Sequence, residues 1–417
     1  MTGSDMTAAD AAATSGAGRG PAPAGSVIEV FLACLRLGLT SFGGPIAHLG
    51  YYRSEFVVRR RWLDEHSFAD LVGLCQFLPG PASTQTCFSI GLLRAGYAGG
   101  LAAWAGFALP SALLLTLFAF GAGHLHGAAW GGLLHGLQVV AVAVVAQAVW
   151  SMARNLCPDR PRAGIAVCAT LITLSAPTAI GQIAAILFGT LAGLVLLRKV
   201  ESAPPASPVA FPIPPRAGVI ALGLFAFLLV GLPLLAAAVP NHALAMIAAF
   251  YRSGALVFGG GHVVLPLLQA AVVGPGWIGN STFLAGYGAA QAVPGPIFTF
   301  AAYLGATMGP APNGWLGAAL CLVAIFLPGL LLVTGMLPFW DRLRRRRKVQ
   351  AAMRGVNAAV VGLLLAALYT PVWTSAILGA KDFALALLAF ALLAVWRLPS
   401  WVVVLVAALG GAGLALI

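Results

Sequence analysis

The chain has 417 residues, of which 60% are hydrophobic and only 8% are charged. A soluble globular protein carries roughly a quarter charged residues, so this composition excludes an ordinary soluble domain. Between Arg252 and Asp341, 88 consecutive residues contain no Asp, Glu, Lys or Arg, and only lipid can solvate the surface of such a stretch. The composition predicts an all-α polytopic membrane protein.

The formal net charge of +12 reflects 23 basic against 11 acidic residues. The basic residues lie in short loops between apolar segments, such as 344–348 ("RRRRK"), as the positive-inside bias of cytoplasmic loops predicts. The sequence contains no basic patch with interleaved aromatic residues, so we expect no nucleic-acid partner. The six cysteines form no CxxC pair and no cluster with histidine, so we expect no metal and no cofactor. No P-loop or nucleophile–base motif appears, and we expect no enzyme.

In chain order, residues 1–26 are rich in Ala, Gly, Ser and Pro and are expected to form a disordered tail. Residues 27–51 form an apolar segment that is broken at Gly43-Gly44-Pro45. Residues 67–78 and 82–95 flank a second break. Each piece can form a helix of roughly 18–21 Å, shorter than the hydrocarbon core of about 30 Å. Because the flanking arginines should all be cytoplasmic, we expect two re-entrant hairpins.

The second break, Pro79-Gly80-Pro81, follows from the chemistry of its residues. Pro79 removes a backbone donor and stops the first helix. Pro81 suits the first turn of the next helix, where a missing N–H costs nothing. Gly80 permits the tight reversal between them. The backbone groups freed at membrane depth need protein, water or a ligand as partners.

The same features recur later in the chain in the same order. Arg36 pairs with Arg252, and Phe42-Gly43-Gly44 pairs with Phe258-Gly259-Gly260, at an offset of 216. The Gln-x-x-Pro-Gly-Pro motif recurs at an offset of 215 residues, and a Leu-Pro pair recurs at an offset of 218. Such an ordered series indicates a duplication. The expected organisation is a first copy (27–200), a linker (201–242) with a connecting transmembrane helix (217–239), and a second copy (243–417).

The charges of matched loops predict opposite orientations for the two copies. The loop 52–65 is rich in arginine, whereas its counterpart 272–281 has no charge. The loop 121–136 is uncharged, whereas its counterpart carries residues 344–348. Inverted-topology repeats require that matched loops lie on opposite sides of the membrane. The connecting helix supplies the extra crossing that makes the number of crossings between the two copies odd. We therefore expect a cytoplasmic N-terminus, about nine full spans and four re-entrant hairpins, the second pair near 243–268 and 282–309.

The breaks and their flanking polar residues are the expected substrate site. Half-helices that start there direct positive dipole ends inward, which suits an anion. Two arginines could clamp a tetrahedral dianion, although each could instead snorkel to a membrane interface. The glutamine amides could donate hydrogen bonds to the ligand, or they could form hydrogen bonds between helices. The substrate-binding set is Arg36, Phe42, Gly43, Gly44, Gln76, Pro79, Gly80, Pro81, Ser83, Arg252, Phe258, Gly259, Gly260, Gln291, Pro294, Gly295 and Pro296.

Four titratable residues are candidates for proton coupling: Glu55, Asp70, His48 and His262. The carboxylates have an alternative role, because they could simply neutralise the neighbouring arginines. The histidines could also be packing or hydrogen-bonded residues, although an imidazole titrates near neutral pH.

The stretches "SFGGPIAHLGYYRSEFVVRRRWLDEHSFADLVGLCQFLPGPASTQ" and "LVFGGGHVVLPLL…AQAVPGPIFTFAAYLG" closely resemble the two signature regions of the chromate ion transporter family, in its long, two-domain form. The resemblance covers both copies. It implies a multi-pass protein of the cytoplasmic (inner) membrane that exports chromate, with sulfate as an analogue, driven by the proton motive force. A homodimer is left open. A lipid-phosphate flippase and a passive anion channel are the alternatives.

One stretch departs from the family's pattern. Members often carry an acidic residue just after the part that matches "VLPLL", whereas here residues 269–277 ("QAAVVGPGW") contain none. If that acid carries protons in other members, this chain lacks that proton carrier.

Overall fold

The computed structural model describes residues 25–124, 127–176, 178–198, 213–343 and 346–416, and every regular element within them is a helix. This agrees with the all-α class. The expected tail lies almost wholly outside the described residues, as does part of the arginine loop at 344–348.

The first copy contains short helices, then the two long helices α5 and α6, and then two shorter helices. They are α2 (Val27–Thr40), α3 (Gly44–Tyr52), η1 (Arg53–Arg59), α4 (Glu65–Phe77), α5 (Ala82–His124), α6 (Ala128–Leu156), α7 (Arg160–Ser175) and α8 (Ala179–Leu196). The connecting helix α9 (Pro215–Ala238) follows.

The second copy repeats this order with its own short and long helices. They are α10 (His242–Ala255), η2 (Gly261–Val263), α11 (Val264–Val272), α12 (Asn280–Ala290), η3 (Ile297–Thr299), α13 (Phe300–Thr307), α14 (Gly314–Met336), η4 (Leu337–Phe339), α15 (Trp340–Leu343), α16 (Arg347–Ala367), η5 (Leu368–Trp373), α17 (Thr374–Ala376), α18 (Ala380–Ala394) and α19 (Ser400–Leu414).

Five stretches of the described chain are long and apolar enough to cross a membrane, whereas the sequence predicts nine. They are Ala82–Ala122, Ala128–Leu156, Pro215–Ala238, Gly314–Phe339 and Arg347–Ala376. The difference lies in α7, α8, α18 and α19, which have 16, 18, 15 and 15 residues. These helices are roughly 22–27 Å long, short of the hydrocarbon core of about 30 Å. Helices α8 and α19 are as apolar as the spanning helix α14, so apolar character alone does not reveal their length.

The label α5 covers two helices joined by a sharp turn. Ala95 (φ −143°, ψ 29°) and Gly96 (φ 64°, ψ −160°) leave the helical conformation. Gly91 and Gly99 lie so close that a Cβ on either would clash with the backbone carbonyl of the other. The residues before the turn therefore fold back along the residues after it, and only the later part of α5 is available to span.

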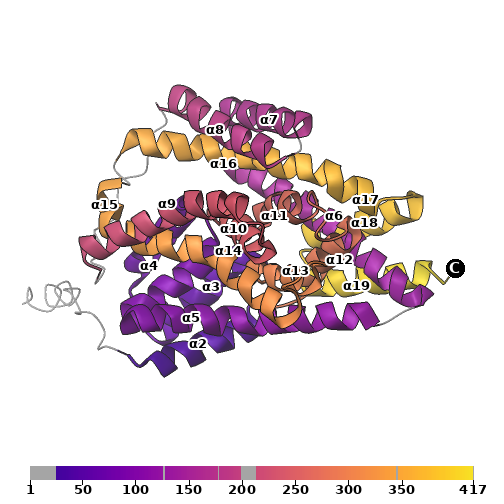
Figure 1. Cartoon of the computed structure of the whole chain (residues 1–417), viewed down its shortest axis with the longest axis horizontal. Coiled ribbons are helices and arrows are strands. Elements are labelled where there is room, and N and C mark those ends of the chain that lie inside the picture. Colours follow the sequence, from indigo (N-terminus) through magenta and orange to yellow (C-terminus); the bar gives the residue numbers. More distant parts are fainter. Residues whose placement is uncertain (1–24, 125–126, 177, 199–212, 344–345, 417) are drawn as a thin grey trace, which may run out of the picture.

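The two copies exchange their packing partners. Helix α6 of the first copy packs against α12, α18 and α19, and helix α16 of the second copy packs against α7 and α8. Close glycine contacts hold both arrangements, because Gly136 abuts the backbone of Ala407 and Gly355 abuts the backbone of Gly189 and Gly193. The copies are thus interlocked rather than separate domains (Figure 1).

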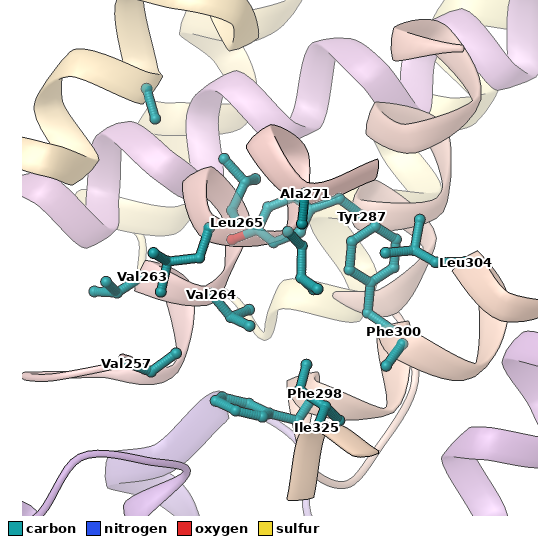
Figure 2. Packing of buried hydrophobic residues seen from close by; sticks show 14 of the residues in the cluster. Val257, Val263, Val264, Leu265, Ala271, Tyr287, Phe298, Phe300, Leu304 and Ile325 are labelled. Carbon is teal, nitrogen blue, oxygen red and sulfur yellow. The ribbon is translucent and has the colours of Figure 1, made fainter. Parts of the chain in front are cut away.

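The largest buried core follows the same exchange. It joins residues of α5 and α6 to the half-helices of the second copy, including Val257, Val263, Tyr287 and Phe298. Figure 2 shows part of this core, with Val263 on one side and Tyr287 on the other. A second core joins α2 and α4 to Leu330 and other residues of α14 and its continuation. Burial therefore fixes the relative position of the two copies where the breaks lie.

Candidate functional site

Both Pro-Gly-Pro motifs interrupt helices. Helix α4 ends at Phe77 and α5 begins at Ala82, whereas α12 ends at Ala290 and η3 begins at Ile297. The central glycines have φ of +119° (Gly80) and +97° (Gly295), a conformation that only glycine adopts without strain. The predicted breaks are therefore confirmed as breaks, and the glycine in each is required by the backbone.

Both Phe-Gly-Gly motifs also interrupt helices. Helix α2 ends before Ser41, and Gly43 and Gly44 have φ of +100° and +78°. Helix α10 ends before Leu256, and the two glycines of the second motif have φ of +74° and +158°. The chain reverses through conformations that favour glycine in each copy.

Crossed hydrogen bonds join the two kinds of break. The Gly80 N–H donates to the carbonyl of Val257 (2.7 Å), and the Gly295 N–H donates to the carbonyl of Ser41 (2.9 Å). Ser41 and Val257 each precede a Phe-Gly-Gly motif and differ by the repeat offset of 216. Each copy's Pro-Gly-Pro break is thus tied to the other copy's Phe-Gly-Gly break.

The long helices α5 and α14 complete the arrangement with the residues that directly follow their Leu-Pro pairs, 109–110 and 327–328. A Cβ on Gly80 would lie 3.2 Å from Cα of Gly329 in α14, and a Cβ on Gly295 would lie 3.0 Å from Oγ of Ser111 in α5. A Cβ on Gly261 would lie 2.9 Å from Ile297 and 3.5 Å from the ring of Pro45. All four breaks therefore meet in one place.

Gln85 was not among the predicted site residues, yet it holds this junction together. Its Nε2 donates to the carbonyl of Pro79 (2.9 Å) and to the carbonyl of Gly329 in the second copy (3.0 Å). The side chain is fully buried. The repeat could not reveal it, because its counterpart at the offset of 215 is Phe300. The available signal was an amide side chain among the small polar residues 83–86 that directly follow a break.

Several buried polar atoms at the junction have no hydrogen-bond partner among the described residues. They are Ser41 Oγ, His48 Nε2, Thr84 Oγ1 and Gln85 Oε1, all on side chains that are at most 1% exposed. A buried polar atom left in this state costs roughly 1–3 kcal/mol. The first three can donate to an oxyanion, whereas the Gln85 oxygen can only accept. Predicted Ser83 lies among them, with its Oγ 3.4 Å from His48 Nδ1.

Two of the predicted ligands lie on exposed surfaces. Arg36 is exposed on α2 between Leu32 and Leu39, which are also exposed, and Gln76 is exposed near the end of α4. Their counterparts in the second copy, Arg252 and Gln291, are half-buried. The arginine clamp and the paired glutamines stay predictions.

Gln291 lies beside the tip of the α18–α19 hairpin. Its side-chain Nε2 has no partner among the described residues, and its backbone carbonyl accepts a hydrogen bond from Ser400 Oγ (3.1 Å). Trp401, the next residue, packs against Phe42 with ring centroids 6.1 Å apart. The tip therefore touches breaks of both copies, which the apolar sequence of α18 and α19 did not indicate.

The four candidate proton carriers have different surroundings. Glu55 pairs with Arg59 and Arg60. Burial alone would raise its pKa, but the hydrogen bonds from both guanidiniums outweigh burial and lower it. Asp70 Oδ1 accepts from Trp340 Nε1 (3.2 Å). The carboxylates thus have the neutralising and structural partners that the alternative role requires.

The histidines both lie at the breaks. His48 belongs to the buried polar group at the junction, whereas His262, in η2, has its Nδ1 2.8 Å from the hydroxyl of Tyr287. Among the described residues, no three His, Cys, Asp or Glu side chains gather as metal ligands do.

Helices α6 and α16 approach the second Phe-Gly-Gly break, and α16 carries an arginine one turn away. A Cβ on Gly259 would lie 3.3–3.6 Å from Leu156, Met152 and Asn357. Arg354 lies three residues before Asn357, so both are on one face of α16, and its positive charge acts on that of Arg162 in α7. Neither arginine was among the predicted site residues.

Comparison with known proteins agrees with this architecture. The family model "Chromate transporter" matches residues 28–194 and again 244–412. The chain is 30% identical to the chromate transport protein of Pseudomonas aeruginosa, covering 94% of this chain and 92% of that protein. It is 27% identical to a probable chromate transport protein of Synechococcus elongatus (93% and 96% covered) and 25% identical to the chromate transport protein of Cupriavidus metallidurans (83% and 82%). No solved structure matches the chain. The chain belongs to the chromate transporter family.

Proposed function

We propose that the protein is a secondary active transporter that exports chromate, or a closely similar tetrahedral oxyanion such as sulfate, from the cytoplasm. The observation that carries the proposal is the pair of crossed hydrogen bonds between Gly80 and Val257 and between Gly295 and Ser41. They bring four helix breaks from two copies together beside buried donors without partners. Irregular backbone at membrane depth is tolerated where it lines a binding site.

The proposed topology is an inverted repeat in the inner membrane with a cytoplasmic N-terminus. The long helices α5, α6 and α9 precede the second copy, and three is an odd number of crossings, as inversion requires. The short helices around the breaks then form re-entrant hairpins, entering from the cytoplasm in the first copy and from outside in the second. The lengths of α7–α8 and α18–α19 support a third such hairpin in each copy.

The proposed anion site lies where the half-helices begin. Helices α3 and α5 begin directly after breaks of the first copy, and η2 and η3 lead into α11 and α13 after breaks of the second. Their N–H groups and dipoles favour an anion. Ser83, Thr84 and His48 would donate hydrogen bonds, and Arg252 would supply charge together with Arg36, as the repeat predicts. Arg354 and Arg162 would raise the local concentration of the dianion on the cytoplasmic side.

Alternating access would arise by rocking the copies about the crossed hydrogen bonds. The site is shared by both copies, so a movement of one against the other exposes it to one side at a time. The proton motive force would supply the energy. A channel would pass the anion without this dependence, and a flippase would act on a lipid phosphate instead.

Chromate uptake into energised, everted membrane vesicles tests the proposal. Export from the cell becomes accumulation in such vesicles, so we expect uptake that a protonophore abolishes and that excess sulfate inhibits. Vesicles without the protein are the control. Uptake that is insensitive to the protonophore would favour the passive channel. Uptake equal to the control would remove chromate as the substrate and move the search to lipid phosphates.

A further inference from the structure

A histidine–aspartate pair joins the two copies away from the helix breaks. His135 of α6 places its Nε2 2.9 Å from Oδ1 of Asp382 in α18. The other carboxylate oxygen of Asp382 accepts from the N–H of Leu378 (2.9 Å), which fixes the carboxylate at the start of α18. Among the ion pairs of the described residues, this one alone connects the first copy to the second.

The pair also stands apart from the other carboxylates whose side chains the structure describes. Those are Glu29, Glu55, Asp64, Glu65, Asp70 and Asp159. All six belong to the first copy, and four of them pair with arginines. Figure 1 shows α4 and α15 at one end of the molecule and α18 at the other. In the proposed topology, Asp382 is thus the described carboxylate at the outer face.

The pair is partly exposed, and few charged groups lie around it. The side chains of His135 and Asp382 are 28% and 16% exposed. Around them, Lys381 lies next to Asp382 on α18, and Tyr369 lies on η5, both exposed. Helix α19 carries no titratable residue, and His135 is the one such group in residues 128–153 of α6. The Nδ1 of His135 has no partner among the described residues.

We propose that the His135–Asp382 pair is the outer proton-binding site that couples the proton gradient to transport. The inference rests on the proposed function of a proton-driven oxyanion exporter. With His135 neutral and its Nε2–H donated to Asp382, a proton from the outer water adds to the lone pair of Nδ1. The product is an imidazolium beside a carboxylate, and no other bond is made or broken.

Coupling requires that the two states of the transporter hold the proton with different affinity. The pair joins the two copies, with His135 on α6 and Asp382 on α18. The coupling requires that α18 shift against α6 between the two states, which changes the distance between imidazole and carboxylate and with it the stabilisation of the imidazolium. Proton binding from outside then favours the state in which the pair is closed.

The experiment uses the full chain in proteoliposomes, with the variants His135→Gln and Asp382→Asn. Two activities are measured: chromate accumulation driven by a pH gradient, and exchange of chromate for chromate at equal pH on both sides. We expect each variant to lose accumulation by about tenfold or more, the size of a typical coupling, and to retain exchange. Accumulation by the wild type should follow the outer pH, and this dependence should vanish in both variants.

Asp159→Asn is the matched control. Asp159 also combines an ion pair with a hydrogen bond from a helix N-terminus, both with Arg162, but within one copy. It should keep both activities and the pH dependence. Gradient-driven accumulation that survives in His135→Gln and Asp382→Asn would overturn the inference, as would a loss of exchange together with accumulation, which would mark the pair as structural. A wild type without chromate exchange would instead overturn the proposed function.

Discussion

Replacing Gln85 by leucine tests whether the junction of the breaks depends on one buried amide. The substitution removes the donor to Pro79 and Gly329 and leaves the volume nearly unchanged. Two intramolecular hydrogen bonds contribute about 1–3 kcal/mol together, and each carbonyl left without a partner costs roughly 1–3 kcal/mol more. The unpartnered Oε1 is lost as well, which offsets part of the cost. We expect a loss of about 2–4 kcal/mol in unfolding free energy.

The assay is thermal unfolding of the purified protein, followed by tryptophan fluorescence, together with chromate transport. Gln76→Leu is the matched control, because Gln76 lies at the same break but is exposed, and exposed substitutions usually change stability by less than about 0.5 kcal/mol. Gln85→Leu should therefore unfold at a clearly lower temperature and lose transport. Equal unfolding temperatures for the two variants would refute the role assigned to Gln85.

Three further substitutions test other parts of the site. Gly295→Ala should lower stability by about 1–2 kcal/mol and abolish transport, since an alanine is strained at φ +97°; Gly121→Ala, where a Cβ meets nothing within 4 Å, should change neither. Arg36→Gln should abolish transport while the protein still inserts, because a lone arginine on an apolar helix face stays there for its charge; unchanged transport would remove the clamp. Asp64→Ala should cost about 0.5–2 kcal/mol at neutral pH, because Asp64 caps α4. Hydrogen bonds from the backbone N–H of Ser67 lower the pKa of Asp64 below its ordinary value of 3.8, so this contribution is present above that value and lost as the pH falls through the folded pKa. Unfolding temperatures across the acid range check the last case, and a difference between variant and wild type that persists in strong acid would contradict it.

The sequence predicted the parts of the site that are duplicated. The offset between the copies located both Pro-Gly-Pro and both Phe-Gly-Gly motifs, and all four are breaks that meet in the structure. The prediction worked because a proline or a glycine at positive φ acts on its own backbone, whatever the tertiary surroundings. The sense of each copy in the membrane stays a prediction from loop charges.

What the sequence missed depends on contacts between distant elements. Gln85 bridges to α14, Ser400 reaches Gln291, and Arg354 lies near Arg162 on another helix. Gln85 corresponds to Phe300 at the repeat offset of 215, so a search for duplication passes over it. The count of nine spans stays a prediction, because five described helices are long and apolar enough to cross a membrane, and the shorter α7, α8, α18 and α19 expose large apolar side chains such as Leu187 and Leu409.

The central site is tested most directly by locating the anion itself. Crystals of the full chain soaked in chromate allow the chromium to be found by its anomalous scattering. We expect one peak between Gly80 and Gly295, with chromate oxygens within about 3.2 Å of the Ser83 or Thr84 hydroxyl, as hydrogen bonds require. Excess sulfate should displace it. A peak elsewhere in the chain, with none at the junction of the breaks, would contradict the proposed site.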